Sequence, residues 1–215
     1  MASLKRSATI TIITIIAAAY LFNLVFGGLE NRFALPNIDY LMSTGEWYRL
    51  LTVALVHGGI FHLGFNLYAL MALGNPIESA FGKSGFLIIF FVSLISGSLL
   101  SSYLASTYQY SVGVSGAVFG LFGAFAVVSK RYGLEVKSIA VIVGINFALG
   151  FVIGGVDWRA HLGGLLSGAA IAWFLARKPD LIGRLLALTG VLGMFTLLQQ
   201  AIAARTNELL FLFGF

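Results

Sequence analysis

The chain has 215 residues, of which 59% are hydrophobic and 10% are charged, and its formal net charge is +5. Soluble domains carry about 25% charged residues, and a water-soluble fold could not bury so much apolar surface, so the composition indicates a membrane protein. The basic residues lie in short groups between apolar runs, which is typical of a topology signal and argues against nucleic-acid binding. The sequence contains no cysteine, so disulfides are excluded.

Seven apolar stretches have about the length that a helix needs to cross a bilayer. The first follows Lys5-Arg6 and could imitate a signal peptide, but it is long enough to span and has no clear cleavage site. Short loops join most of the stretches, so we expect an all-α, polytopic membrane helix bundle in which residues 1–215 form one domain. The predicted spans are 8–28, 60–80, 85–105, 114–129, 138–155, 159–176 and 182–203.

Residues 29–59 form the one long connection between predicted spans. The segment contains Trp47, Tyr48 and Arg49 together with a second apolar patch. We therefore predict a loop that is partly embedded in the membrane.

The basic residues predict the orientation of the chain, because cytoplasmic loops carry an excess of lysine and arginine. With a cytoplasmic N-terminus, nine basic residues lie at inner ends and four at outer ends. Spans two, four and six then all run from outside to inside. The inner residues are Lys5, Arg6, Lys83, Lys130, Arg131, Lys137, Arg177, Lys178 and Arg184, and the outer ones are Arg32, Arg49, Arg159 and Arg205.

This topology places polar residues near the outer ends of three separate helices. His62 and Asn66 begin the second span, Ser115 begins the fourth, and His161 lies in the first turn of the sixth. The simplest interpretation is a shared polar site slightly below the outer surface.

Glycines predict which helix faces meet. In the fourth span they recur at three- and four-residue spacing, and in the sixth span a GxxxG pair begins three residues after His161. Small residues allow helices to approach closely in a membrane, so two facing stripes would bring Ser115 and His161 together. A lone GxxxG pair is more often only a packing feature. The stripes are Gly113, Gly116, Gly120 and Gly123 in one helix and Gly164 and Gly168 in the other.

Ser115 alone would be read as a helix cap, because serine favours the first turn of a helix. As a nucleophile it needs a base, and the neutral imidazole of His161 suits that task near pH 7. A hydrogen-bonded interhelical histidine is the alternative interpretation of His161. Asp157 lies four residues before His161 and next to Arg159, so we interpret it as a helix-start residue and expect a Ser-His dyad.

His62 and Asn66 are spaced i, i+4 and therefore project from one face of the second span. Together with the Ser115 backbone N–H they could stabilise a developing oxyanion. Interhelical hydrogen bonding that only holds the bundle together is the alternative. His57 lies five residues before His62, on a different face, so we expect a supporting role.

A zinc site must be considered, because the three histidines of the chain all lie toward the outer side. The sequence contains no His-Glu-x-x-His run and no acidic residue placed as a general base. We therefore predict no metal and no cofactor.

Four motifs together resemble the rhomboid family of intramembrane serine proteases over about residues 8–176. Gly113-Val114-Ser115-Gly116 is similar to the family's GxSG motif, and residues 160–168 are similar to its histidine-bearing motif. Residues 57–66 resemble its paired-histidine and asparagine element. Residues 46–49 resemble its tryptophan–arginine signature, and Glu78 falls where the family often has a glutamate.

The resemblance implies a role for each matching residue. Ser115 would be the nucleophile and His161 the base, with His62, Asn66 and the Ser115 N–H in the oxyanion hole. Phe119 occupies the place of an aromatic ring that stacks on the catalytic histidine. The supporting residues would be His57, Phe119, Gly113, Gly116, Gly164, Gly168, Trp47 and Arg49.

The resemblance also implies an architecture, a location and a substrate. A six-helix rhomboid-like core over 8–176 with an added helix over 182–203 suggests the "six plus one" variant. We expect neither the cytosolic N-terminal domain of some relatives nor an organelle-type extension. The protein would lie in the bacterial cytoplasmic (inner) membrane with its active site toward the outer face, in a wet cavity rimmed by residues 29–59. Its partners would be the lipid bilayer and single-pass transmembrane substrates, cut in or near their helices.

Two other functions must be considered. A catalytically inactive rhomboid-like relative could bind and escort membrane proteins, but the intact Ser115, His161, His62 and Asn66 argue against it. The second alternative is a small transporter. An inverted repeat would support that function, and the sequence shows none.

Overall fold

The computed structural model describes residues 7–106, 109–131, 137, 141, 145, 156–177, 180 and 200. These residues form helices and no strand, which confirms the all-α fold class. The elements are α1 (Ala8–Phe26), α2 (Leu29–Phe33), α3 (Ile38–Thr44), α4 (Arg49–Thr52), the 3₁₀-helix η1 (Val53–Leu55), α5 (Ile60–Leu104), α6 (Ser115–Arg131) and α8 (Trp158–Arg177).

Three predicted spans correspond to single helices. The spans 8–28, 114–129 and 159–176 are α1, α6 and α8, with bounds that differ by at most two residues. The predicted spans 138–155 and 182–203 lie outside the described residues apart from positions 141, 145 and 200.

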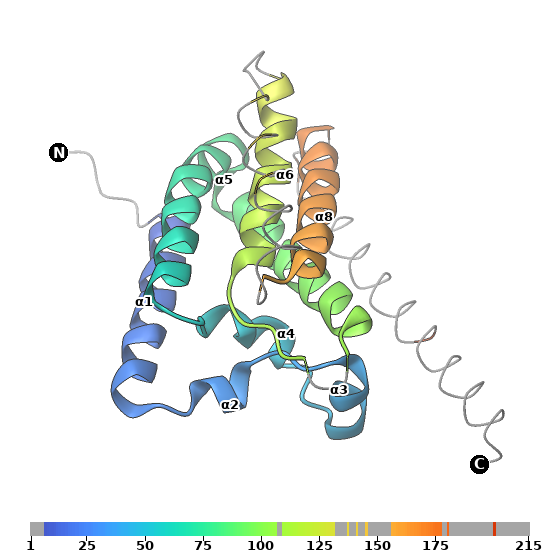
Figure 1. Cartoon of the computed structure of the whole chain (residues 1–215). Coiled ribbons are helices and arrows are strands. Elements are labelled where there is room, and N and C mark those ends of the chain that lie inside the picture. Colours follow the sequence, from blue (N-terminus) through green and yellow to red (C-terminus); the bar gives the residue numbers. More distant parts are fainter. Residues whose placement is uncertain are drawn as a thin grey trace.

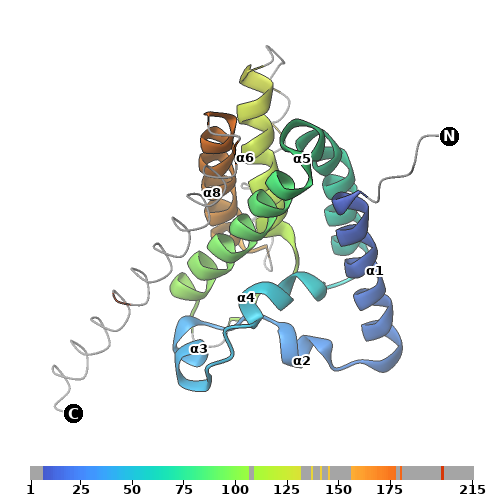
Figure 2. The same ribbon diagram turned by 180° about the vertical axis from the view of Figure 1, so that it is seen from behind.

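The predicted spans 60–80 and 85–105 form the two limbs of the long helix α5. Gly82 breaks this helix, with φ at 71° and ψ at 172°. A positive φ is accessible to glycine at little cost because it has no Cβ. Figures 1 and 2 show the two limbs diverging from the bend.

The helices pack around the second limb of α5. α6 and α8 lie side by side, and both pack on α5, whereas α1 lies along its first limb (Figures 1 and 2). The predicted connection 29–59 contains α2, α3, α4 and η1, and it covers the end of the bundle at which α6 and α8 begin. The polar starts of these helices therefore lie beside this segment.

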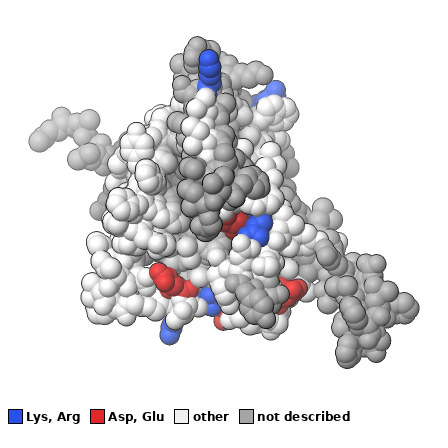
Figure 3. All heavy atoms as spheres, in the orientation of Figure 1, with Lys and Arg blue, Asp and Glu red and all other residues white. Residues whose placement is uncertain are grey.

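Two described helices, α1 and α5, are long and apolar enough to cross a membrane, and Ser115–Ser129 of α6 is a shorter apolar helix. α1 exposes large apolar side chains, and Leu24, Val25 and Phe26 are 71–72% exposed. A helix that is apolar all round is suited to lipid contact. In Figure 3 the charged side chains gather mainly near the α2–α4 end, with basic residues at the opposite end and a largely uncharged surface between them.

Glu78 fastens α1 to α5. Its carboxylate accepts hydrogen bonds from Ser7 Oγ at 2.7 Å, Ala8 N at 3.0 Å, and both Thr9 N and Thr9 Oγ1 at 2.9 Å. These donors include backbone N–H groups of the first turn of α1, which have no acceptor within their own helix. A negative charge at a helix N-terminus is also favoured by the helix dipole. Glu78 therefore stabilises the start of α1.

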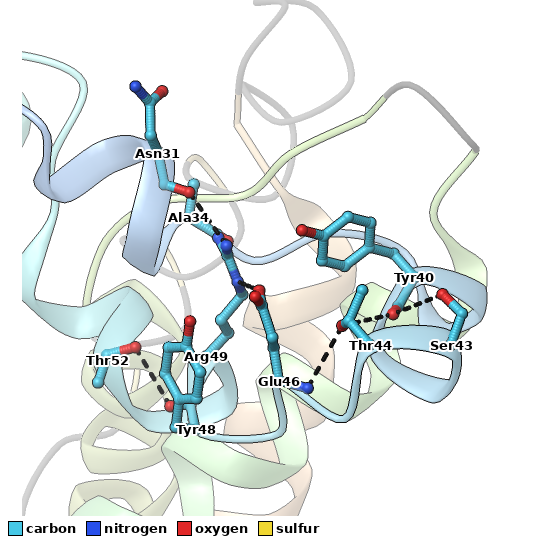
Figure 4. Close-up of polar contacts among 9 residues, drawn as sticks. All are labelled: Asn31, Ala34, Tyr40, Ser43, Thr44, Glu46, Tyr48, Arg49 and Thr52. Atoms are coloured by element: carbon cyan, nitrogen blue, oxygen red, sulfur yellow. Dashed lines mark hydrogen bonds and ion pairs between the residues drawn. The ribbon is translucent and has the colours of Figure 1, made fainter.

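Arg49 organises the segment before α5 (Figure 4). Its side chain is buried and donates to the carbonyls of Ala34 at 2.8 Å and Asn31 at 3.0 Å, and to Glu46 at 2.6 Å. The guanidinium thereby connects the C-terminal end of α2 to α4. Trp47 packs against the hydrophobic core beside it.

The second limb of α5 also holds this segment. Ser98 Oγ donates to the Leu50 carbonyl at 2.9 Å, and Ser102 Oγ donates to the Pro36 carbonyl at 2.7 Å. Serines of an apolar helix thus satisfy backbone acceptors of an irregular segment, which would otherwise be costly to bury.

Candidate active site

Ser115 is the first residue of α6, and His161 lies in the first turn of α8. The Ser115 Oγ and His161 Nε2 atoms are 2.9 Å apart, a hydrogen-bond distance between two residues 46 positions apart in the chain. His161 is 5% exposed, so this contact is shielded from bulk solvent. The geometry allows proton transfer from the serine hydroxyl to the imidazole.

Phe119 orients the imidazole. It lies one turn after Ser115, and its ring stacks on His161 with centroids 4.0 Å apart and an interplanar angle of 6°. Stacking on a flat ring restricts rotation of the histidine side chain, so Ser115 and Phe119 of one helix hold the histidine of the other.

The glycine stripes allow this close approach. A Cβ built on Gly164 would lie 1.9 Å from the Gly116 carbonyl oxygen, and one built on Gly168 would lie 2.1 Å from the Gly120 carbonyl oxygen. Neither position can carry a side chain unless the helices move apart. α6 and α8 are therefore in backbone contact, as the spacing predicts.

Gly113 brings His62 beside the segment that leads to Ser115. A Cβ on Gly113 would lie 2.8 Å from His62 Cε1, and the φ of Gly113 is 111°, in the region that favours glycine. Ser115 N–H is one of the first donors of α6, which have no acceptor within their own helix. The His62 ring therefore lies against the residue two positions before Ser115.

Asn66 is buried next to His62 on α5. Its Nδ2 donates to the His62 carbonyl at 3.0 Å. This amide group carries two N–H donors, so one remains for another acceptor. Both residues belong to α5, where the i, i+4 spacing puts them on one face of the helix.

His57 lies in the turn before α5 and is 2% exposed. Its ring packs edge-on against His62 with centroids 5.1 Å apart. Burial, and then the charge of His62, lower the pKa of His57 to about 4, so the ring is neutral near pH 7. Within the described part of the chain no group of three or more metal-ligating side chains occurs.

Asp157 is the residue before α8, and its Oδ1 accepts from Arg159 N at 3.2 Å, as expected of a helix-start residue. Its contacts with Ser101 and Ser111 were not predicted. Burial raises the pKa of Asp157, but hydrogen bonds from Ser101 and Arg159 outweigh burial and hold the pKa below its usual range. Asp157 is therefore ionised at neutral pH.

The chain matches the family model of the rhomboid domain over residues 44–178. It is 38% identical to rhomboid protease GluP of Bacillus subtilis, over 75% of this chain and 31% of the relative. It is 31% identical to putative rhomboid protease YdcA of the same organism, over 65% of this chain and 72% of the relative. It is 26% identical to rhomboid protease AarA of Providencia stuartii, over 93% of this chain and 84% of the relative.

The chain thus spans about a third of GluP but most of YdcA and AarA. The family match includes Arg49 and the starts of α5, α6 and α8. Together with the apolar helices, it identifies an integral membrane protein. The chain belongs to the rhomboid family of intramembrane serine proteases.

Proposed function

We propose that this protein is a serine endopeptidase that hydrolyses peptide bonds in or near the transmembrane helices of membrane-protein substrates. Ser115 is the nucleophile and His161 the general base, with no metal or cofactor. The observation that carries the proposal is the 2.9 Å separation of Ser115 Oγ and His161 Nε2. The rhomboid protease names of the relatives support the same reaction.

In the proposed reaction, His161 Nε2 takes the hydroxyl proton while Ser115 Oγ attacks the scissile carbonyl carbon. The carbonyl oxygen becomes an oxyanion, which accepts hydrogen bonds from Ser115 N–H, His62 and Asn66. The imidazolium then donates its proton to the leaving amine. Water, deprotonated by His161, hydrolyses the acyl-enzyme and restores the serine.

The remaining residues position this machinery. Phe119 and His57 hold the two histidine rings by stacking and edge contact. Gly113, Gly116, Gly164 and Gly168 permit the close approach of the segments. Trp47 and Arg49 support the segment beside the site.

We further propose that residues 1–215 form one membrane domain in the bacterial inner membrane, with the N-terminus in the cytoplasm and the active site toward the outer face. The distribution of nine basic residues against four supports this orientation. A substrate helix must unwind to expose its carbonyl, and water must reach the acyl-enzyme. An active site near the outer surface meets both needs.

Fluorophosphonate labelling of the detergent-solubilised full chain tests the proposal. The reagent forms a covalent bond with an activated serine, so we expect labelling in the wild type and none in Ser115→Ala. Mass spectrometry of the labelled protein locates the adduct. A folded wild type that does not react would contradict the protease proposal and favour an inactive binding protein.

A second prediction concerns the oxyanion donors. Asn66→Ala is expected to lower turnover by about 10²–10³-fold with little change in KM, because the lost donor acts on the charge that develops in the transition state. Cleavage of a single-pass substrate by the reconstituted enzyme measures both constants.

Asn75→Ala is the matched control. Asn75 lies on the same helix but is exposed, and its amide contacts the sulfur of Met71 at 3.5 Å. Turnover of the Asn75 variant should equal that of the wild type. Equal activity of both variants would leave Asn66 with a packing role only.

A further inference from the structure

A buried polar cluster lies where α5 ends and α8 begins. Asp157 accepts hydrogen bonds from Ser101 Oγ at one carboxylate oxygen, and from Arg159 N at 3.2 Å and Arg159 Nε at 2.9 Å at the other. The side chains of Arg159 and Asp157 are 10% and 13% exposed. Arg159 Nη1 also donates to the Leu104 carbonyl at 2.9 Å. The Ser111 side chain lies beside the Asp157 carboxylate and helps to hold its pKa below the usual range.

The cluster connects three segments of the chain. Ser101 and Leu104 belong to the last turn of α5, and Arg159 belongs to α8. Ser111 lies in the segment before α6, where its backbone N–H and carbonyl pair with Leu35 at 2.8 and 2.9 Å. One carboxylate thus joins the approach to α6 and the start of α8 to the end of α5.

Ser111 and Asp157 occupy equivalent positions in the chain relative to Ser115 and His161. Ser111 lies four residues before Ser115, and Asp157 lies four residues before His161. The Asp157 carbonyl accepts from His161 N at 3.3 Å, in the first turn of α8. Ser111 and Asp157, which lie beside each other in the cluster, therefore each precede one member of the Ser115–His161 pair by the same number of residues.

The glycine contacts alone do not fix the ends of these helices. Gly164 contacts Gly116 in the first turn of α6, and Gly168 contacts Gly120, so these glycines set the separation of the two helices. Such packing contacts are not directional, and helix ends fray unless they are held. A buried ion pair contributes little net stability, but its directional hydrogen bonds select one arrangement. The hydrogen bond between Ser115 and His161 is sensitive to such an arrangement, because a displacement of about 1 Å can lower activity about 10²-fold.

We propose that Asp157 is a positioning residue for the Ser115–His161 pair. Its carboxylate holds the start of α8 and, through Ser111, the approach to α6, and it acts through these two segments rather than on the reacting atoms. The inference rests on the proposed protease function.

The test compares two carboxylates that each accept three or more hydrogen bonds. Asp157→Asn keeps the size of the side chain but removes the charge and one acceptor oxygen. Glu78→Gln makes the same change where α5 holds α1. Glu78 lies 16 residues after His62, which is about 24 Å along the helix. The Glu78 variant is therefore the control that lowers stability without displacing the Ser115–His161 pair.

We expect fluorophosphonate labelling and kcat of Asp157→Asn to fall about 10–100-fold with KM unchanged. Glu78→Gln should show a comparable fall in Tm but a labelling rate like that of the wild type, measured at a temperature where both are folded. Ser111→Ala should slow labelling without a large fall in Tm. The double variant Ser111→Ala/Asp157→Asn should be no slower than Asp157→Asn alone, because both changes break one connection.

The inference is overturned if Asp157→Asn labels at the wild-type rate, or if both carboxylate variants slow labelling equally at matched loss of Tm. If Asp157→Asn does not fold, the Ser111→Ala variant tests the inference in its place. A wild-type labelling rate in Ser111→Ala then overturns the inference. Failure of the protease proposal is a different result, since the folded wild type itself would then not be labelled.

Discussion

Replacing His161 by alanine is expected to lower peptide cleavage by about 10⁴–10⁶-fold while the helix bundle stays folded. Without the imidazole, the Ser115 hydroxyl has no base at hydrogen-bond distance in the described structure, and a neutral hydroxyl is a poor nucleophile. Phe119 also loses the ring on which it stacks. Cleavage of a reconstituted single-pass substrate and fluorophosphonate labelling should fall together, and circular dichroism should show unchanged helix content.

Ser115→Ala and the double variant are the controls for this prediction. Residues that act as one unit are not additive, so the double variant should be no slower than either single variant. Cleavage that persists in both single variants would exclude the dyad. Loss of cleavage with normal labelling in His161→Ala would assign His161 to substrate binding instead of to activation of Ser115.

Replacing Gly164 by valine is expected to abolish labelling and to destabilise the protein by about 3 kcal/mol or more. The first carbon of the new side chain would lie 1.9 Å from the Gly116 carbonyl oxygen and 2.7 Å from its carbon, both backbone atoms. α6 and α8 must then separate, and overpacking of this kind costs about 1–3 kcal/mol even where side chains can yield. The separation also lengthens the distance between Ser115 and His161. Thermal unfolding and the labelling rate measure the two effects.

Gly64→Val is the matched control, because a Cβ on Gly64 meets no atom within 4 Å although the residue also lies in a helix. Valine has the same helix propensity at both positions, so the difference between the variants reports the contact alone. If Gly164→Val retained the wild-type labelling rate, close contact of α6 and α8 would not be required for activity.

The sequence predicts those parts of the fold that depend on long apolar runs. α1, α6 and α8 begin and end within two residues of their predicted bounds, because each apolar run has the length of one helix. The sequence could predict that Ser115 and His161 lie at the same membrane depth and on facing helix surfaces. The topology sets their depth, and the glycine stripes indicate which helix faces meet. The contact at 2.9 Å agrees with that expectation.

The remaining features depend on contacts between distant residues. α2 and α4 have five and four residues, and helices this short are held by tertiary contacts rather than by periodicity. Arg49, for example, holds backbone carbonyls 15 and 18 positions away. Asp157 contacts Ser101, 56 positions earlier, so its local pattern predicted only a helix start.

The bend at Gly82 has a mechanical consequence for the proposed oxyanion donors. His62 lies 20 residues before Gly82, which is about 30 Å along a straight helix. A rotation of about 5° at the glycine would swing the imidazole through about 2–3 Å over that length. α1 packs on this limb at Gly74, where a Cβ would lie 2.5 Å from the Thr9 side chain. Gly82 touches no reacting group and lies at the opposite end of this limb from His62. Its backbone conformation nevertheless sets the position of a proposed catalytic donor.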